Sequence, residues 1–405
     1  MLQSVAYQAR MGENAMASYE ADAPSGPEPR SLWPLVKFGD VVECTNYVER
    51  DPLGAGVERY VGLEHIEPEC LHIKNWGLVK DGTSFTRKFV KGQVLFGKRR
   101  AYQRKVAVAE FDGICSSDIL TFQPRNDELI PELLPFIVQS DGFFDHALGT
   151  SAGSLSPRTK WSQLKEYSFP LPPKDEQRRI ADILWAAEEV VSEYSLSQRK
   201  GAILLNVLRH SLIMDDKDAL NPLWRRAYLR EIVELWSGQH VESRYCDSGP
   251  EGVPYLTGPA DFPDGAICVT KYTKRPKVLC QSGDVLVTVK GSGAGKVVRA
   301  DRPYCISRQL MAARPSEADP DFVYSVLKSY SEELNRMADG VIPGITREQL
   351  LSTAVLVPPR EEQQQIGRCL AAFERTLEEL AKHVLNSKRL RNEITSHLMP
   401  QIREV

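Results

Sequence analysis

Leu171–Ile180 reads LPPKDEQRRI, and Val357–Ile366 reads VPPREEQQQI, so the chain carries the same pattern twice, 186 residues apart. Each copy follows a stretch rich in β-forming residues and opens a long helical pattern. Solenoid repeats have periods of roughly 20–50 residues, so this much longer period indicates a duplicated domain. The sequence therefore predicts two similar modules, each ending in a long helix.

The repeat extends upstream at an offset of 191 residues. Gly92–Leu95 (GQVL) matches Gly283–Leu286 (GDVL), and Phe38–Glu43 matches Leu229–Glu234. Loop insertions and deletions account for the drift from 191 to 186. Further matches in the same order are Lys105 with Lys296, Ser116 with Ser307, Pro124 with Pro315, and Gln163–Leu164 with Gln349–Leu350.

Composition indicates an ordinary globular protein. At 405 residues, two to three domains are expected, and the hydrophobic (42%) and charged (26%) fractions are typical. No apolar run is long enough to span a bilayer, and the start lacks the order of a signal peptide. The eight cysteines are scattered without a Cys-x-x-Cys pair, which favours free thiols in a cytoplasmic protein.

Short strand-like segments followed by helical ones fill both modules, which predicts an α+β fold. Glycine and proline punctuate the strands, as at Gly92, Gly97 and Pro124. The expected organisation is a disordered tail at 1–30, a first module at 31–172, a central helix at 173–215, a second module at 216–356 and a C-terminal helix at 357–405.

The two long helical patterns have sustained steps of four and three residues, which is typical of coiled coils. Pro-Pro followed by acidic residues suits each helix start, because carboxylates complement the helix dipole. The alternative is two amphipathic helices, each packed on its own module. The first stripe runs through Leu184, Ala187, Val191, Tyr194, Gln198, Gly201, Leu205, Leu208 and Leu212. The second runs through Leu370, Phe373, Leu377, Leu380 and Val384, meets Ser387 and Arg391, and is expected to shift to Leu390, Ile394 and Leu398.

A glycine-rich run, Gly291–Lys296 (GSGAGK), resembles a phosphate-binding loop but does not fit one. Lys290 stands where the first glycine of that motif is needed, and Val297 replaces the Ser or Thr that follows the lysine. The aligned stretch Arg99–Lys105 contains no glycine. A mobile loop between two strands is the better interpretation.

Basic residues concentrate at the same place in both modules, although the net charge is −3. Phe85–Lys105 holds eight basic residues and no acidic one, and Lys271–Arg302 holds eight basic residues and two acidic ones. Lys and Arg neutralise phosphates, and Arg can also bind guanine edges. A solvated charged face is the ordinary alternative, but its duplication favours DNA binding.

No catalytic set is apparent. Asn221–Trp224 departs at its third position from the Asn/Asp-Pro-Pro-aromatic motif of amino-methyltransferases, and no nuclease-like spacing of acidic residues occurs. His65, Cys70 and His72 lie close together without matching a zinc pattern. We therefore expect no cofactor, no metal and no enzymatic activity.

The paired Leu/Val-Pro-Pro-x-x-Glu-Gln-x-x-Ile segments, together with the strands at Gly92 and Gly283, resemble the specificity subunit of type I restriction-modification systems. The resemblance covers nearly everything after residue 31, although the tail has no counterpart. It implies two target recognition domains separated by two long antiparallel helices, an internal pseudo-twofold repeat, and no catalysis. The resemblance also implies that the chain binds a split, asymmetric target in double-stranded DNA. The protein partners that it implies are two methyltransferase subunits and restriction subunits.

Helix length and charge give specific expectations within this resemblance. Asp175–Leu212 would span about 57 Å as a helix, so it would fix the number of unread base pairs between half-sites. Gln364-Gln365 replaces Arg178-Arg179, so the helix starts need not bind partners identically. The implied DNA contacts are Lys98, Arg99, Arg100, Tyr102, Arg104, Lys105 and Lys160 in the first half, and Lys290, Ser292, Lys296, Arg299 and Arg347 in the second. The implied partner contacts on the helices are Ile180, Leu184, Val191, Ile366, Leu370, Phe373 and Leu377.

Three alternatives stay open. The chain could be an enzyme with an unrecognised active site, or a coiled-coil scaffold that does not bind DNA. It could also serve a methylation-only or phage-defence complex that lacks a restriction subunit. Methyl transfer by the isolated chain would favour the first, and absence of DNA binding with a methyltransferase present would favour the second.

Overall fold

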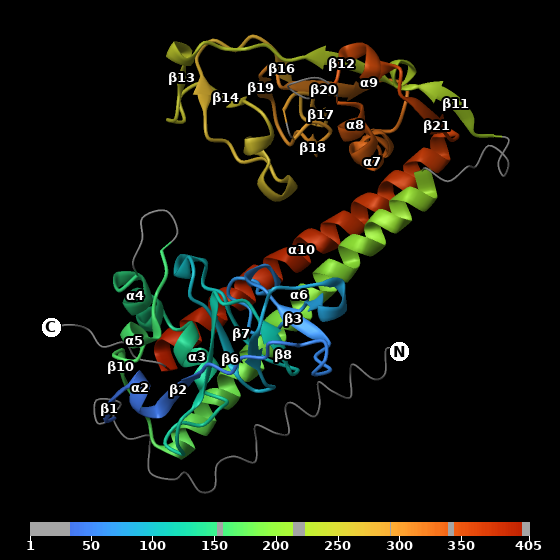
Figure 1. Ribbon diagram of the computed structural model, residues 1–405. Helices are drawn as coiled ribbons and strands as arrows, with labels where there is room; N and C mark the ends of the chain where they lie inside the picture. The colour runs from blue at the N-terminus through green and yellow to red at the C-terminus, as the bar shows by residue number, and fades with distance from the viewer. Residues whose placement is uncertain (1–32, 152–156, 214–222, 292, 339–343, 399–405) are drawn as a thin grey trace, which may run out of the picture. The chain divides into compact units, whose positions relative to one another are not determined.

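The computed structural model describes residues 33–151, 157–213, 223–291, 293–338 and 344–398, and the expected tail at 1–30 lies outside them (Figure 1). The chain divides into two compact units. The first comprises Met1–Glu193 and Val384–Val405, and the second comprises Tyr194–His383. Each unit therefore contains one half of each long helix.

Three sheets form the β structure described for the first unit. Four strands in the order β2-β9-β6-β7 make one sheet, β4-β3-β8-β5 make another, and β1 pairs with β10. The bounds are β1 Leu35–Lys37, β2 Val42–Thr45, β3 Arg59–Val61, β4 Gly77–Leu78, β5 Arg87–Phe89, β6 Val94–Gly97, β7 Val106–Val108, β8 Gly113–Cys115, β9 Ile119–Pro124 and β10 Ser168–Pro170.

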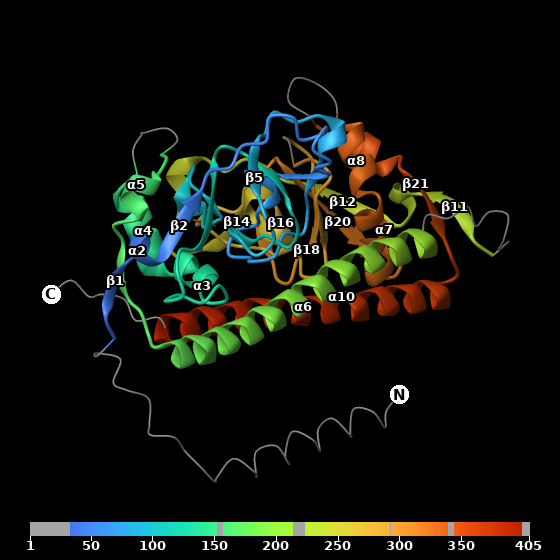
Figure 2. The ribbon, with the colours of Figure 1, turned by 60° about the horizontal axis from the view of Figure 1, so that its bottom comes forward.

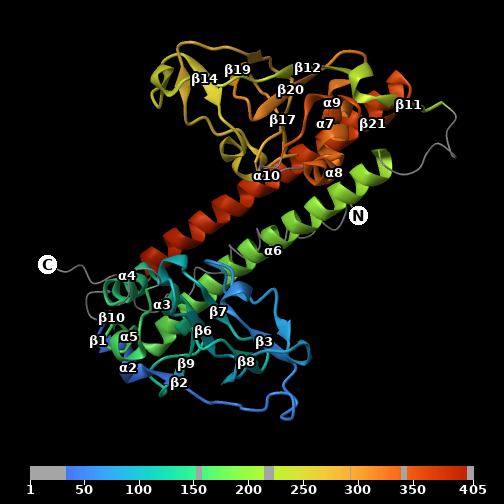
Figure 3. The ribbon, with the colours of Figure 1, turned by 45° about the horizontal axis from the view of Figure 1, so that its top comes forward.

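The second unit has the same three sheets with one additional strand. Its orders are β12-β20-β17-β18, β13-β15-β14-β19-β16 and β11-β21, and Figure 3 shows β12, β20 and β17 next to one another. Strand β13 at the sheet edge has no counterpart among the strands described for the first unit. The bounds are β11 Arg225–Tyr228, β12 Val233–Ser237, β13 Cys246–Asp247, β14 Val253–Leu256, β15 Tyr272–Thr273, β16 Leu279–Cys280, β17 Val285–Thr288, β18 Val297–Arg299, β19 Tyr304–Ile306, β20 Leu310–Pro315 and β21 Ala354–Val357.

The duplication extends to an uncommon detail of strand pairing. β3 pairs with β8 in parallel, whereas their other neighbours are antiparallel, and β14 pairs with β19 in the same parallel way. A parallel pair needs a long crossover connection, so its recurrence at the same place reflects a common topology rather than similar local propensities. The predicted α+β class and the duplication are confirmed.

Short helices pack against the sheets. In each unit an apolar cluster contains side chains of the sheets, the short helices and the long helices. In the first unit Phe38, Phe122 and Phe143 lie in a cluster that also contains Ile180 and Leu184. In the second unit Phe322 lies in the equivalent cluster. The bounds are α2 Phe38–Val41, α3 Leu134–Gln139, α4 Asp141–Gly149 and α5 Trp161–Leu164, then α7 Pro320–Ser329, α8 Ser331–Met337 and α9 Arg347–Leu351.

The long helices are α6 (Lys174–Ile213) and α10 (Arg360–Leu398), and they run in opposite directions (Figure 2). Most of the predicted stripe positions are buried or half-buried. Gly201 marks a close approach, because a Cβ there would lie 2.5 Å from Leu377 Cδ2. The predicted shift to Leu390 is wrong: Leu390 is 57% exposed, whereas Arg391 is 2% exposed.

A buried glutamine explains why the Pro-Pro…Glu-Gln motif recurs. Gln177 Nε2 donates to the carbonyl oxygens of Pro172 (2.9 Å) and Glu128 (2.7 Å), and its Oε1 accepts from Ile130 N (3.0 Å). Gln363 repeats the pattern, with Nε2 donating to Pro358 O (2.8 Å) and Oε1 accepting from Asp319 N (2.8 Å). Each glutamine thus ties the first turn of a long helix to the segment that leads into α3 or α7.

Each unit also buries one Glu–Arg ion pair between α6 and α10. In the first unit Arg391 donates to Glu188 Oε2 (2.6 Å) and to the carbonyl of Glu69 (2.9 Å), while Glu188 Oε1 accepts from Leu71 N (3.2 Å). In the second unit Arg209 pairs with Glu374 at 2.5 Å. The periodicity of apolar residues cannot reveal a buried ion pair. For this reason the sequence alone indicated that Arg391 interrupts the buried stripe of the C-terminal helix.

The second pair is less completely enclosed. The Glu374 side chain is 21% exposed, against 1% for Glu188. Burial raises the pKa of the Glu374 carboxyl, and the nearby Arg209, Lys328 and Arg299 act in the opposite direction. The two ion pairs therefore serve the same helix pairing in different electrostatic surroundings.

We predict that Gln177→Ala and Gln363→Ala each lower the free energy of unfolding by about 1–3 kcal/mol, because each leaves buried backbone groups without partners. Gln364→Ala is the matched control, since Gln364 lies on the same helix turn but is exposed, and its expected change is within about 0.5 kcal/mol. Chemical denaturation of the purified chain measures both. Equal effects at positions 363 and 364 would contradict the assignment.

We predict that Arg391→Met lowers the free energy of unfolding by about 3–5 kcal/mol, because it leaves the Glu188 carboxylate buried without its cation. Replacing both residues (Glu188→Met with Arg391→Met) should recover most of that loss, as apolar substitutes often do. Arg389→Ala is the control, because its ion pair with Glu393 is exposed and contributes about 0–1 kcal/mol. A double variant less stable than Arg391→Met would refute this account.

Candidate nucleic-acid interface

The two basic loops have left-handed backbone conformations at two equivalent positions. In the first unit the loop joins β6 to β7, and Arg100 (φ 54°) and Arg104 (φ 51°) are left-handed. In the second unit the loop joins β17 to β18, and Gly291 (φ 85°) and Gly295 (φ 87°) occupy the positions 191 residues later. Glycine adopts this conformation without steric cost. The glycine-rich run therefore has a conformational explanation.

Each loop is held by the same two neighbouring segments. Lys98 N donates to Asp118 O (3.0 Å), and Thr159 N donates to Lys98 O (3.0 Å). In the second unit Val289 N donates to Gln309 O (2.8 Å), and Ile345 N donates to Val289 O (2.9 Å). The basic loop, the turn before β9 or β20 and the segment before α5 or α9 thus form one continuous surface in each unit.

Positive side chains gather on this surface in the first unit. Asp118 forms ion pairs with Arg158 (3.0 Å) and Arg99 (3.6 Å), while Arg100 and Lys160 are exposed. Burial, and then the neighbouring Arg87, lowers the pKa of the Lys98 ammonium.

The sequence did not single out Arg158. Its basic segment PRTK, at 157–160, could have suggested it, since the predicted Lys160 ends the same segment. Tyr102 is 56% exposed on the 3-10 turn Ala101–Gln103, where its ring is available to stack on a base.

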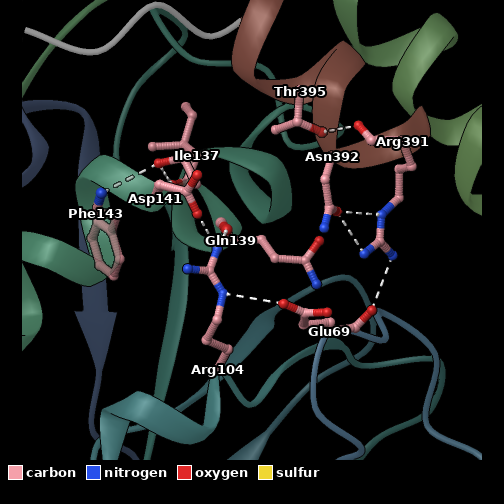
Figure 4. A network of polar contacts seen from close by, with 10 residues as sticks. Glu69, Arg104, Ile137, Gln139, Asp141, Phe143, Arg391, Asn392 and Thr395 are labelled. Atoms are coloured by element: carbon pink, nitrogen blue, oxygen red, sulfur yellow. Dashed lines mark hydrogen bonds and ion pairs between the residues drawn. The ribbon is translucent and has the colours of Figure 1, made fainter. Parts of the chain in front are cut away.

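Two residues of the same loop point into the unit instead. Arg104 forms ion pairs with Asp141 (2.8 Å) and Glu69 (3.6 Å) and donates to Gln139 O (2.8 Å) (Figure 4). Its guanidinium also lies 4.5 Å from the centre of the Phe144 ring. These contacts hold the Arg104 side chain within the unit, and a DNA contact by Arg104 stays a prediction.

Lys105 is likewise engaged within the unit. Its Nζ donates to Leu63 O at 2.5 Å. Sequence could not separate these two residues from Arg99 and Arg100, because adjacent positions in a tight turn face different directions.

The second unit divides its predicted residues in a similar way. Lys290 and Lys296 are exposed on the loop, and Ser292 lies outside the described residues. Arg299 pairs with Asp321 at 2.5 Å and lies over the Tyr324 ring. Arg347 donates to Leu235 O at 2.6 Å. Arg299 and Arg347 therefore have partners within the unit, whereas the two lysines are exposed.

The predicted partner contacts on the helices are largely internal. Ile180, Leu184 and Leu370 are fully buried in the cores of their own units, and Val191 and Ile366 are 5% and 6% exposed. Phe373 and Leu377 pack against the second core. Among the described residues, the large apolar side chains that these helices expose are Ile183, Val190, Leu385 and Leu390 in the first unit and Tyr194, Leu196, Ile203, Leu204 and Val207 in the second.

His65, Cys70 and His72 have ordinary structural partners. His65 Nδ1 accepts from Gly62 N (2.9 Å), His72 contacts Glu110 (2.9 Å), and Cys70 Sγ donates to the His72 carbonyl. Within the described residues no group of three His, Cys, Asp or Glu side chains is arranged to hold a metal. No helix in the same part of the chain combines the length and apolarity needed to cross a membrane.

The fold thus defines a duplicated α+β protein with two paired long helices and an equivalent basic loop in each unit. The chain belongs to the family described as the type I restriction modification DNA specificity domain, whose model matches residues 33–192 and 223–387. The expectation drawn from the repeated motif is confirmed.

Individual relatives agree with this assignment. The chain is 23% identical over 378 residues to the MjaX type I restriction enzyme specificity subunit of Methanocaldococcus jannaschii, covering 85% of this chain and 88% of that protein. Its fold resembles the type I restriction-modification S subunit from M. genitalium (TM-score 0.61, 17% identity, 95% and 99% covered). It also resembles a chain from a structural study of complex assembly and conformational transition in a type I system (TM-score 0.57, 23% identity, 94% and 100% covered).

Arg100 gives a test of the loop's backbone strain. A non-glycine residue in the left-handed conformation costs roughly 1–2 kcal/mol, so we predict that Arg100→Gly raises the free energy of unfolding by about 1 kcal/mol. The same change should weaken DNA binding, because it removes an exposed cation. Arg104→Gly relieves the same strain but removes two ion pairs, so it should be destabilising. Thermal unfolding and fluorescence anisotropy measure these effects, and stabilisation by both variants would contradict them.

Proposed function

We propose that this chain directs a type I restriction-modification complex to a split, asymmetric sequence in double-stranded DNA, with each unit recognising one part. One observation carries the proposal: the two units present basic loops on the same backbone arrangement but with different side chains. Arg99, Arg100 and Tyr102 in the first loop correspond to Lys290, Gly291 and Gly293 in the second. Different side chains at equivalent positions favour different base preferences, and hence a non-palindromic target.

The chain itself is proposed to be non-catalytic and to need no cofactor. Methyl transfer, and cleavage where a restriction subunit is present, would then belong to partner subunits. Both units expose apolar side chains on the long helices, among them Val190 (45%) and Ile203 (60%). Apolar surface of this kind is typical of protein interfaces, and its presence in each unit supports docking of two methyltransferase subunits.

Two further features belong to the proposal. The number of unread base pairs between the half-sites is expected to follow the length of α6 and α10. A cytoplasmic location is expected, where cellular DNA is accessible and the free cysteines of the described chain stay reduced.

A methylation-only or phage-defence complex would use the same chain without a restriction subunit. The helix surfaces described above serve either assembly equally. A scaffold without DNA recognition is disfavoured, because it gives no reason for two equivalent basic loops.

Methylation of host DNA tests the proposal directly. The chain would be co-expressed with the adjacent methyltransferase gene, and modified bases would be mapped by single-molecule sequencing. We expect a bipartite, asymmetric motif that disappears when this chain is deleted. Modification that persists without the chain, or a palindromic motif, would refute the proposal.

The salt dependence of binding tests the loop lysines. We predict that Lys290→Ala with Lys296→Ala weakens DNA binding on all sequences, and lowers the slope of log K against log salt by about 2, because each phosphate contact contributes roughly 0.9. Arg225→Ala is the control, since Arg225, on β11, forms an ion pair with Glu231. Titration of the methyltransferase complex at several salt concentrations gives the slopes, and an unchanged slope in the double variant would exclude these lysines.

A further inference from the structure

The second unit contains a cavity of about 610 Å³ beside its basic loop. Its lining includes the turn Ser307–Gln309 and the segment that includes His240 and β13. The volume falls within the roughly 300–1,000 Å³ of small-molecule sites, so the cavity can accept a group the size of a nucleotide. None of its lining residues was singled out from the sequence as a site residue.

Hydrogen bonds hold the turn rigidly against the basic loop. Gln309 O accepts from Val289 N, the residue before Lys290. Ser307 Oγ donates to Thr257 O (2.6 Å) and accepts from Gln309 N (3.1 Å). The cavity is therefore continuous with the surface that we propose to contact DNA.

The side-chain position of Gln309 requires a glycine at position 258. A Cβ at position 258 would lie 2.2 Å from Gln309 Oε1, so Gly258 is required for the glutamine side chain to lie where it does. The Gln309 amide thus lies directly against the backbone of Gly258.

The part of the lining that β13 supplies distinguishes this unit from the first. Strand β13 is the additional strand of the second unit, and it pairs with β15 through Cys246 and Asp247. Val241 N donates to the Tyr255 hydroxyl (3.2 Å), which fixes the segment before β13. Arg275 lies 4.4 Å from the centre of the Tyr245 ring and covers the same segment. An ordered wall of this kind indicates a built cavity rather than a gap between loops.

The cavity carries polar groups that match the chemistry of DNA. Arg308, Lys271 and His240 are exposed side chains on its lining, with Gln309 beside them and Asp247 as an acidic residue in the same lining. Arginine donates two hydrogen bonds to the O6 and N7 atoms of guanine, and glutamine pairs with the N6 and N7 atoms of adenine. Lysine and histidine suit the neighbouring phosphates.

Comparison with the first unit supports a role in specificity. At the offset of 191 residues, Arg308 and Gln309 correspond to Ser117 and Asp118. Asp118 is occupied by Arg99 and Arg158, whereas the second unit has the cavity at this turn. The same turn therefore carries different chemistry in the two units.

We propose that Arg308 and Gln309 are specificity-determining residues that bind base edges, most simply of purines, in the half of the DNA target recognised by the second unit. The cavity accommodates that part of the DNA. This inference rests on the proposed function, and it adds where in the second unit the bases are distinguished from the phosphates.

The test uses the chain assembled with its methyltransferase, and compares Arg308→Ala with Gln309→Ala against wild type by mapping methylated bases. We expect the preference at one or two base pairs in one half of the motif to fall about tenfold or more, with the other half unchanged. Arg225→Ala serves as the control in the same unit. An unchanged motif, methylated to within twofold of wild type, would overturn the proposal.

The variant Arg308→Lys distinguishes hydrogen bonding to a base from electrostatic attraction to phosphates. Lysine keeps the charge but lacks the two-pronged geometry, so we expect relaxed specificity with nearly retained affinity for non-specific DNA. Anisotropy titrations with duplexes substituted in either half give both quantities. Equal weakening on every duplex would show a phosphate contact and refute the base-binding role.

Failure of the two hypotheses gives different results. If the wild-type complex methylates no bipartite motif, the proposed function fails before any variant is compared. If the wild type is specific and the variants retain its motif, only the role of Arg308 and Gln309 fails. Thermal unfolding is measured alongside, and the conservative Arg308→Lys variant keeps the test valid if either alanine variant is unstable.

Discussion

The buried glutamines Gln177 and Gln363 are the contacts on which the architecture depends. Each sits one turn into a long helix and binds both the carbonyl of the first motif proline and the backbone that enters α3 or α7. An amide side chain is suited to this because it donates and accepts at the same time. A carboxylate in its place would face carbonyl oxygens without a proton to donate. The motif therefore connects each long helix to the globular part of its unit. Because each unit contains one such connection, the motif occurs twice in the chain.

Two further constraints build on this joint. Once the helix starts are fixed, the stripe along α6 and α10 brings Glu188 to Arg391 in one unit and Glu374 to Arg209 in the other. A buried ion pair tolerates little displacement, because a shifted helix would leave both charges without compensation. These pairs thus specify the register of the antiparallel helices more sharply than leucine contacts alone would. Their surroundings differ, so the two halves of the helix pair need not be equally stable.

The two units place different residues at the loop positions that require a left-handed backbone conformation. The second unit uses Gly291 and Gly295 where the loop needs left-handed conformations, whereas the first uses Arg100 and Arg104. The first unit therefore accepts strain in exchange for a cation on the surface at Arg100 and an internal ion-pair network at Arg104. Duplication preserves the backbone and leaves the side chains free to diverge, which is what recognition of two unlike half-sites requires.

The sequence by itself determined the duplication, the α+β class, the start of each long helix and most of its buried stripe. These features follow from local patterns, namely a repeated motif and a helical period, that survive without knowledge of long-range contacts. Only the tertiary structure decided which basic residues reach the surface, since Arg104 and Arg299 find acidic partners far away in sequence. The same holds for Arg391, which is buried by Glu188, 203 positions away. The cavity beside Arg308 was equally hidden, because its walls meet only when β13, β14 and β19 are brought together in one sheet.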